Sequence, residues 1–155
     1  MNADSLVQQL AGLMASAPDG SQWRPRKPVQ RARLDELEAE YGIRLPADLR
    51  AVLEVYGGGT LVRPGTTPLG IGPMSDLFNL NGDPFFEENI PGMFVFGGDG
   101  GGSVYSYDPE NALGRGEYAI FIVPMGDLAL DAARYVARDL AEAVEGVLAG
   151  RDPYA

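Results

Sequence analysis

The 155-residue sequence contains no cysteine and no histidine, and Lys27 is its single lysine. It therefore offers no thiolate nucleophile, no Ser-His-Asp triad and no imidazole base. The usual structural zinc sites, which are built from Cys and His ligands, are excluded as well. An enzyme would have to work with carboxylates, tyrosine, arginine or the one lysine. The missing residue types therefore restrict the possible chemistry, and we expect no bound metal and no cofactor.

Long hydrophobic runs are also missing. No stretch approaches the roughly 20 apolar residues needed to cross a bilayer. The first twenty residues lack the basic head and apolar centre of a signal peptide, and the lack of cysteine fits a reducing compartment. We expect a cytoplasmic protein with one domain spanning residues 1–155, rich in loops because 21 glycines and 12 prolines occur in the chain.

Basic residues are absent from the whole segment Pro64–Gly114, although the chain carries 12 basic and 22 acidic residues. This segment holds seven acids: Asp76, Asp83, Glu87, Glu88, Asp99, Asp108 and Glu110. Such a balance disfavours nucleic acid and anionic membrane as partners. A basic protein is the partner that it would attract. The alternative is that the acidity only keeps the protein soluble.

The spacing of apolar residues predicts helices in both terminal parts of the chain. One runs through Leu6–Met14, with Asp4 or Ser5 as its cap, and the C-terminal helix either starts at Asp131 or follows a strand and starts near Ala137. Two more helices run through Leu34–Tyr41, ending at Gly42, and from Pro46 to Tyr56. Residues 17–29 are predicted to be a loop whose Trp23 folds onto the core.

Five short runs of β-branched and aromatic residues predict strands. They are Thr60–Pro64, Pro68–Gly72, Gly92–Gly97, Ser103–Asp108 and Tyr118–Pro124. Between the second and third we expect a short helix over 76–80 and then a polar loop that carries Phe85 and Phe86. The resulting fold class is α+β, with a twisted, mostly antiparallel sheet flanked by N-terminal and C-terminal helices.

A glycine cluster lies in "FVFGGDGGGSVYSYD" (Phe94–Asp108). A phosphate cradle would need a helix after the glycines and usually a lysine nearby, but here a strand follows. A calcium loop would need several oxygen ligands at set positions, and this turn supplies one carboxylate, Asp99. We therefore interpret residues 97–102 as the bend of a hairpin.

Two of these segments resemble the motifs of the SUKH superfamily. "LPADLRAVLEVYGGGTL" (Leu45–Leu61) resembles its opening motif, in which a leucine-proline pair starts a short helix that ends on an aromatic residue and small residues. The glycine-containing stretch is similar to its second motif, and "YAIFIV" with the terminal helix also matches. The likeness covers about 34–148, which we take as the core, and leaves residues 1–33 as a helix and basic loop extension.

The resemblance implies a non-enzymatic protein with no catalytic residues. Many bacterial members of the superfamily are immunity proteins that bind and neutralise polymorphic toxins, often nucleases, and others are interaction modules. We expect the first role, with a basic toxin as partner, and keep an intracellular regulatory module without a toxin as the alternative. The predicted contacts are Asp76, Asp83, Phe85, Phe86, Glu87, Glu88 and Asp99. Glu87 and Glu88 are read as contacts rather than catalytic acids, because adjacent residues do not face each other across a cleft.

Overall fold

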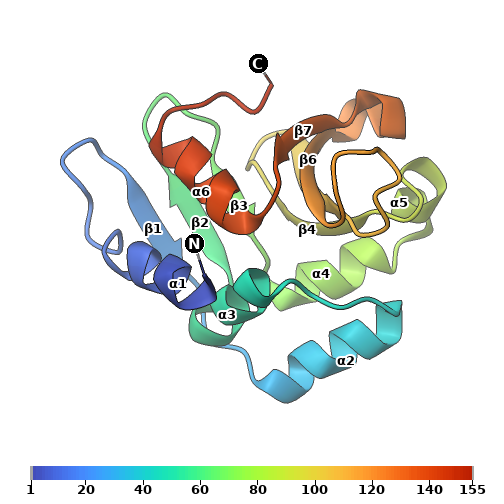
Figure 1. Ribbon diagram of the computed structural model, residues 1–155, viewed down its shortest axis with the longest axis horizontal. Helices are drawn as coiled ribbons and strands as arrows, with labels where there is room; N and C mark the ends of the chain where they lie inside the picture. Colours follow the sequence, from blue (N-terminus) through green and yellow to red (C-terminus); the bar gives the residue numbers. More distant parts are fainter. Residues whose placement is uncertain (1, 155) are drawn as a thin grey trace.

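The computed structural model describes residues 2–154, and within them the chain forms an α+β fold of six helices and two antiparallel sheets, as Figure 1 shows. The helices are α1 (Ala3–Ala11), α2 (Arg31–Tyr41), α3 (Ala47–Tyr56), α4 (Met74–Asn81), α5 (Pro84–Asn89) and α6 (Leu140–Leu148). The strands are β1 (Gln22–Pro25), β2 (Gly59–Val62), β3 (Leu69–Ile71), β4 (Phe94–Gly98), β5 (Ser103–Asp108), β6 (Ala119–Pro124) and β7 (Arg134–Ala137). Two short 3-10 turns, η1 (Met125–Asp127) and η2 (Leu130–Ala132), precede β7. Every helix in this part of the chain is too short or too polar to span a membrane.

The predicted single sheet is divided into two, with strand orders β1-β2-β3 and β4-β5-β6-β7. The sheets meet where the Gly72 N–H, just after β3, donates to the Phe96 carbonyl of β4 at 2.8 Å. A side chain at Gly97 would overlap the Gly70 carbonyl oxygen, so only glycine allows this approach. Strand β4 ends at Gly98. Gly97, which we placed in both a strand run and the bend, and Gly98, which we placed in the bend, thus belong to the strand.

The glycine-rich stretch is a hairpin, as predicted. β4 and β5 are antiparallel neighbours with an irregularity between Val95 and Gly97. In the bend, Gly100 has a φ of 75°, the left-handed conformation that favours glycine. The glycines thus shape the backbone of the hairpin.

The predicted loop at 17–29 contains a strand, β1, which pairs with β2. Trp23 is 1% exposed and meets the Tyr56 ring edge-on at 5.5 Å between ring centroids. This confirms that Trp23 belongs to the core. The strand was missed because Pro25 and the nearby prolines are typical of loops, whereas at a sheet edge proline is tolerated.

Helices α2 and α3 follow the prediction, and both end at a left-handed glycine, Gly42 or Gly57. The predicted start of α1 is wrong: the helix is capped by Asn2, whose side chain accepts from the Ser5 N–H at 2.8 Å. For the C-terminal helix we left two starts open, and the structure agrees with the one that follows a strand. Strand β7 ends at Ala137, and α6 begins at Leu140 with Asp139 as its cap, so the start at Asp131 is wrong.

Two hydrophobic clusters hold the fold together. The larger one joins the N-terminal part to both sheets and α6, with Leu6, Trp23, Phe96 and Val144 all almost fully buried in it. The smaller one lies between α5 and the outer face of β4, β5 and β6. Residues 1–33, which we predicted as an extension, therefore contribute Leu6 and Trp23 to the same hydrophobic core as the following residues. The division of the domain at residue 33 stays a prediction.

Candidate partner-binding surface

Most of the predicted contact residues lie on α4 and α5, two short helices at one end of the four-stranded sheet (Figure 1). Helix α4 begins after Pro73 and carries Asp76 in its first turn, where a negative charge interacts favourably with the helix dipole. Helix α5 replaces the predicted polar loop. Asp83 caps it by accepting from the Phe85 N–H at 3.0 Å, and Pro84 occupies the first position.

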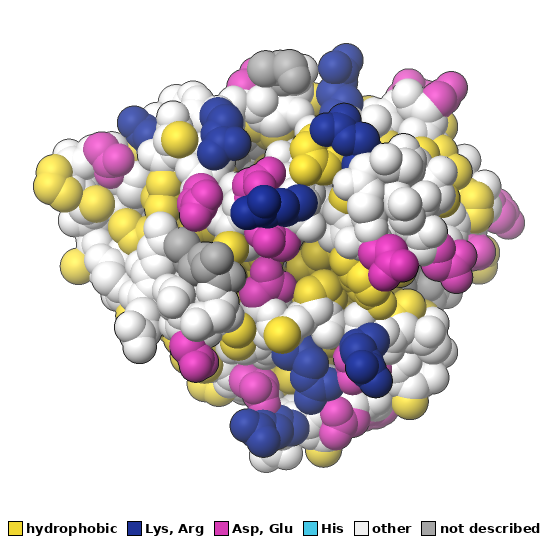
Figure 2. Space-filling model, in the orientation of Figure 1, with side chains coloured by type: hydrophobic (Ala, Val, Ile, Leu, Met, Phe, Trp, Pro, Cys, Tyr) yellow, Lys and Arg dark blue, Asp and Glu magenta, His cyan; other side chains and the backbone are white. Residues whose placement is uncertain are grey.

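Four predicted acids are exposed on these helices: Asp76, Asp83, Glu87 and Glu88. Within residues 2–154, none of the four has a lysine or arginine nitrogen within 4.0 Å. The right-hand edge of Figure 2, where Figure 1 places α5, shows acidic side chains and no lysine or arginine on the face drawn. The carboxylates on α4 and α5 are thus available to a basic partner.

The two phenylalanines of α5 have different surroundings. Phe85 is 44% exposed, so it can contact a partner. Phe86 is only 5% exposed and packs with Ile90 and Val95 in the smaller cluster. Our expectation that Phe86 is a surface anchor is corrected, because the loop is a helix and its two faces separate these neighbours.

Asp99 lies apart from the acids of α4 and α5, at the far end of β4 (Figure 1). Its Oδ1 accepts from the Gly101 N–H at 2.9 Å and from the Ser103 N–H at 3.1 Å. Its Oδ2 accepts from the Tyr154 hydroxyl at 3.3 Å. The oxygens of this half-buried carboxylate therefore already accept hydrogen bonds from the turn and from Tyr154. For that reason we do not group Asp99 with the acids of α4 and α5.

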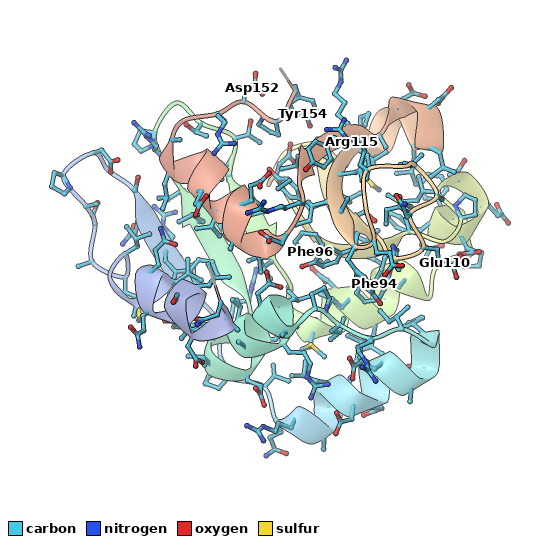
Figure 3. The ribbon with its side chains drawn as sticks, in the orientation of Figure 1. Phe94, Phe96, Glu110, Arg115, Asp152 and Tyr154 are labelled. Carbon is cyan, nitrogen blue, oxygen red and sulfur yellow. The ribbon has the colours of Figure 1, made fainter. Side chains whose placement is uncertain are left out.

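A hollow of about 190 Å³ adjoins α5. Glu87 of α5 and Glu110, in the loop after β5, both line it, and its apolar wall includes Ile43, Met93 and Phe94. Figure 3 labels Glu110 and Phe94 on this side of the molecule. Glu110 was missing from our predicted contacts. Its place in the base-free segment is the signal that could have included it.

The end of α2 also lines this hollow, through Tyr41 and Gly42, and Tyr41 is held in place by a hydrogen bond to α4. The Tyr41 hydroxyl donates to the Phe78 carbonyl of α4 at 2.6 Å, and burial raises the pKa of Tyr41. This tyrosine therefore stays neutral and joins α2 to α4. Arg33 contacts α4: its guanidinium lies 4.1 Å from the Phe78 ring centroid, and it pairs with Glu36 at 2.9 Å.

The basic N-terminal segment does not neutralise this surface by ion pairing. Arg24, Arg26 and Lys27 are exposed, and none of them forms an ion pair in the described part of the chain. Arg26 and Lys27 border a shallow hollow with residues 73–75 at the start of α4. The segment therefore lies beside α4 and leaves the carboxylates of α5 free.

No metal centre is apparent in residues 2–154, where no three Asp or Glu side chains are grouped closely enough to hold an ion. Oxygen-donor sites for calcium need six to eight ligands, which these exposed, separate carboxylates do not supply. The chemistry that the surface offers is charge attraction together with the exposed ring of Phe85.

Comparison with known proteins identifies the family. The model of the SMI1 / KNR4 family (SUKH-1) matches residues 28–146. The match includes α2 to β7 and most of α6, and so contains both motifs that resembled SUKH proteins in the sequence. None of the curated proteins matches the sequence at a significant level.

Proposed function

Because this chain belongs to the SMI1 / KNR4 family (SUKH-1), we propose that it is a non-enzymatic immunity protein that binds and neutralises a cognate toxin. The observation that carries the proposal is the set of four exposed carboxylates on α4 and α5 without ion pairs. Immunity proteins are common among bacterial members of the SUKH superfamily, and they act in the cytoplasm by direct binding.

The charge of this surface favours a nuclease as the toxin. A nuclease presents lysine and arginine to the phosphates of its substrate, and these phosphates are its strongest electrostatic contacts. The carboxylates of α4 and α5 would occupy the same basic groove in place of the polyanion. Complementary charge accelerates association and fixes orientation.

The hollow between Glu87 and Glu110 fits one long basic side chain of such a toxin. The aliphatic part of an arginine or lysine would lie along Met93 and Phe94, and its charged end would lie between the two carboxylates. Phe85, on the same helix as Glu87, would supply apolar contact beside it. Interface energy concentrates in such aromatic and arginine contacts.

The test uses the toxin domain encoded beside this chain and measures inhibition of its activity. The double variant Glu87→Gln, Glu88→Gln removes two exposed charges from α5. The matched control Asp4→Asn, Glu145→Gln removes two exposed charges from α1 and α6. We expect the α5 variant to need about tenfold more protein for the same inhibition, and the control to act as the wild type.

Inhibition that is equal for both double variants would contradict the proposed surface. Failure of the wild-type protein to bind or inhibit this toxin domain would contradict the immunity function itself and favour a regulatory module.

A further inference from the structure

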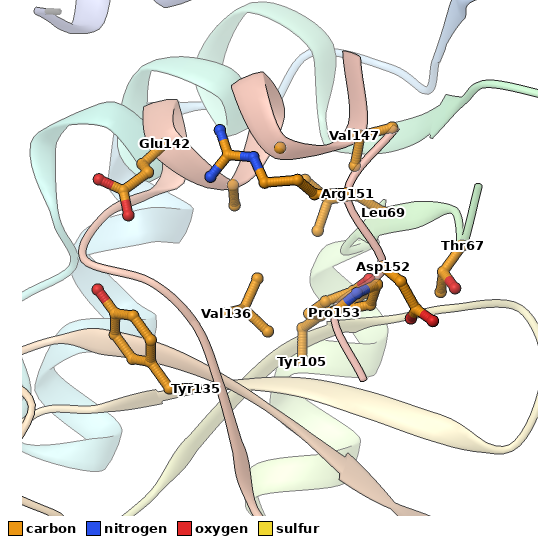
Figure 4. A pocket seen from close by; sticks show the side chains of 12 residues that line it. Thr67, Leu69, Tyr105, Tyr135, Val136, Glu142, Val147, Arg151, Asp152 and Pro153 are labelled. Atoms are coloured by element: carbon orange, nitrogen blue, oxygen red, sulfur yellow. The ribbon is translucent and has the colours of Figure 1, made fainter. Parts of the chain in front are cut away.

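A second cavity, far from the acidic helices along the chain, lies between α6, β7 and the segment that follows α6. It has a volume of about 290 Å³, close to the lower end of small-molecule sites. Figure 4 shows its lining side chains. Val136, Leu69, Val147 and Pro153 supply apolar walls. The cavity is therefore suited to the apolar body of a small ligand.

Three of the polar groups of the cavity lie at one end, and Thr67 and Asp152 lie at the other. Figure 4 shows the Arg151 guanidinium and the Glu142 carboxylate at the same end, with the Tyr135 hydroxyl turned toward them. Within residues 2–154 the Arg151 side chain has no ion pair or hydrogen bond, and the Tyr135 hydroxyl has no hydrogen-bond partner. The guanidinium of the exposed residue Arg151 and the hydroxyl of the half-buried Tyr135 are thus free to donate to a ligand at this end of the cavity.

The two acids that line the cavity are already occupied. Glu142 pairs with Arg138 at 3.2 Å, which offsets its charge. The Asp152 carboxylate is exposed and accepts from the Tyr154 N–H at 2.9 Å. Neither acid therefore provides Arg151 with a counter-charge within 4.0 Å.

Two more arginines without ion pairs in residues 2–154 lie near the cavity and contact Tyr135 or Tyr154, although neither lines it. The Arg115 guanidinium stacks 3.8 Å from the centroid of the Tyr135 ring. Arg134 donates only to the Tyr154 carbonyl, at 3.5 Å. Figure 3 labels Arg115 and Tyr154 at this edge of the molecule, and Figure 2 shows basic side chains there. Arg115 and Arg134 thus add positive charge near a cavity whose own lining has one arginine, Arg151, and two acids, Glu142 and Asp152.

The segment after α6 forms one wall of the cavity and is fixed in place. The Tyr154 hydroxyl is hydrogen-bonded to the Ser103 hydroxyl and donates to Asp99 in the glycine-rich bend. The Arg151 N–H donates to the Gly146 carbonyl at 2.8 Å. The bend thus holds Arg151 and Pro153 against the cavity, which gives Asp99 a positioning role.

We propose that this cavity binds a small organic carboxylate, an aliphatic or aromatic acid whose apolar body lies against Val136 and Val147. Its carboxylate pairs with the Arg151 guanidinium and accepts from the Tyr135 hydroxyl. Such charge-assisted hydrogen bonds are stronger than neutral ones, and arginine suits a planar carboxylate. This site is separate from the toxin-binding surface, so either proposal can fail without the other.

The experiment titrates octanoate into the full chain and follows backbone amide NMR signals. We expect saturable shifts at Val136, Ala143 and Gly146, which line the cavity. Arg151→Gln should weaken binding about tenfold. Arg26→Gln removes one exposed positive charge elsewhere and should leave binding unchanged. Octylamine, which has the same apolar body and the opposite charge, should bind more weakly than octanoate.

Gly146→Leu tests the location. A Cβ at this position meets only Arg151 atoms, at 3.9 Å, so a side chain can be accommodated, and it would fill the cavity. Replacing a helical glycine should also maintain or raise the melting temperature. We expect this variant to lose octanoate binding while staying folded. Equal affinity of octanoate for wild type and Gly146→Leu, equal affinity for octylamine, or no shift at about 10 mM octanoate would overturn the proposal.

Discussion

Asp48, the second residue of α3, joins two helices that are distant in the sequence. Its Oδ1 accepts from the Leu49 N–H at 2.8 Å, and its Oδ2 accepts from the Leu140 N–H at 3.2 Å, at the start of α6. Burial raises the pKa of the Asp48 carboxyl above its ordinary value, and the nearby Asp139 raises it further. The oxygens of Asp48 are therefore structural, whereas its negative charge is unfavourable.

Asp48 gives a prediction for the pH dependence of stability. Because its folded pKa lies above the ordinary value of 3.8, its contribution to folding stability falls as the pH rises from that value through the folded pKa. Asp48→Asn keeps an acceptor and removes the charge, so its stability should depend less on pH over this range. Asp48→Ala leaves the Leu140 N–H without its partner and should be roughly 1–3 kcal/mol less stable than Asp48→Asn.

Urea unfolding at several pH values between about 4 and 7 measures both effects. Equal stability of the alanine and asparagine variants would show that the hydrogen bond accepted by the remaining asparagine oxygen does not matter. An unchanged pH dependence in Asp48→Asn would show that the carboxyl does not titrate in this range.

Helix α5 places two adjacent phenylalanines, Phe85 and Phe86, on different faces, so we expect them to have different roles. Phe85 and Phe86 contact each other edge-on, with ring centroids 5.7 Å apart. Phe86 completes the smaller hydrophobic cluster under the helix, and Phe85 lies on the outer surface. One is expected to contribute to stability and the other to binding.

Alanine substitution at each position tests this division. Phe86→Ala should lower the free energy of unfolding by roughly 3 kcal/mol, because it opens a space in a packed cluster. Phe85→Ala should change it by less than about 1 kcal/mol and should weaken toxin binding. Chemical unfolding and a binding titration on both variants measure the two effects. A Phe85→Ala variant with unchanged toxin affinity would remove this ring from the proposed contact.

Much of the element order was predictable from periodicity, and the exceptions have physical causes. Helices α2 and α3 have regular apolar stripes and end at glycine, so their ends were clear. Strand β1 is held by pairing with β2, a contact between distant parts of the chain, and its prolines concealed it. Strand β7 and α6 follow each other closely, so the apolar pattern fitted either one long helix or a strand followed by a helix, and left the start of α6 open.

The candidate site was only partly predictable for the same reason. The base-free segment identified the acids, but only the fold shows that the Asp99 carboxylate is hydrogen-bonded within the turn and that Glu110 lines the same hollow as Glu87. The family resemblance came from short motifs with fixed backbone roles. Gly97 shows what such motifs cannot predict. A side chain at this position would overlap the Gly70 carbonyl oxygen of β3, a strand that lies more than 20 residues earlier in the sequence.

Over the whole molecule, charge is distributed unevenly in a chain with a net charge of -10. Exposed acids without ion pairs in residues 2–154 occupy α4 and α5, and Arg151 lines the cavity beside α6. A basic partner approaching such a molecule is steered toward α4 and α5, and added salt screens the attraction beyond about 10 Å. The association rate, more than the final affinity, reports this steering.

The most direct test of the proposed function is therefore the association rate with the cognate toxin domain, measured by stopped flow as the salt concentration is raised. The account predicts a steep fall with salt for the wild type and for Asp4→Asn, Glu145→Gln. It predicts a slower and less salt-dependent rate for Glu87→Gln, Glu88→Gln. A wild-type rate that does not change with salt, or the same change in both double variants, would contradict it.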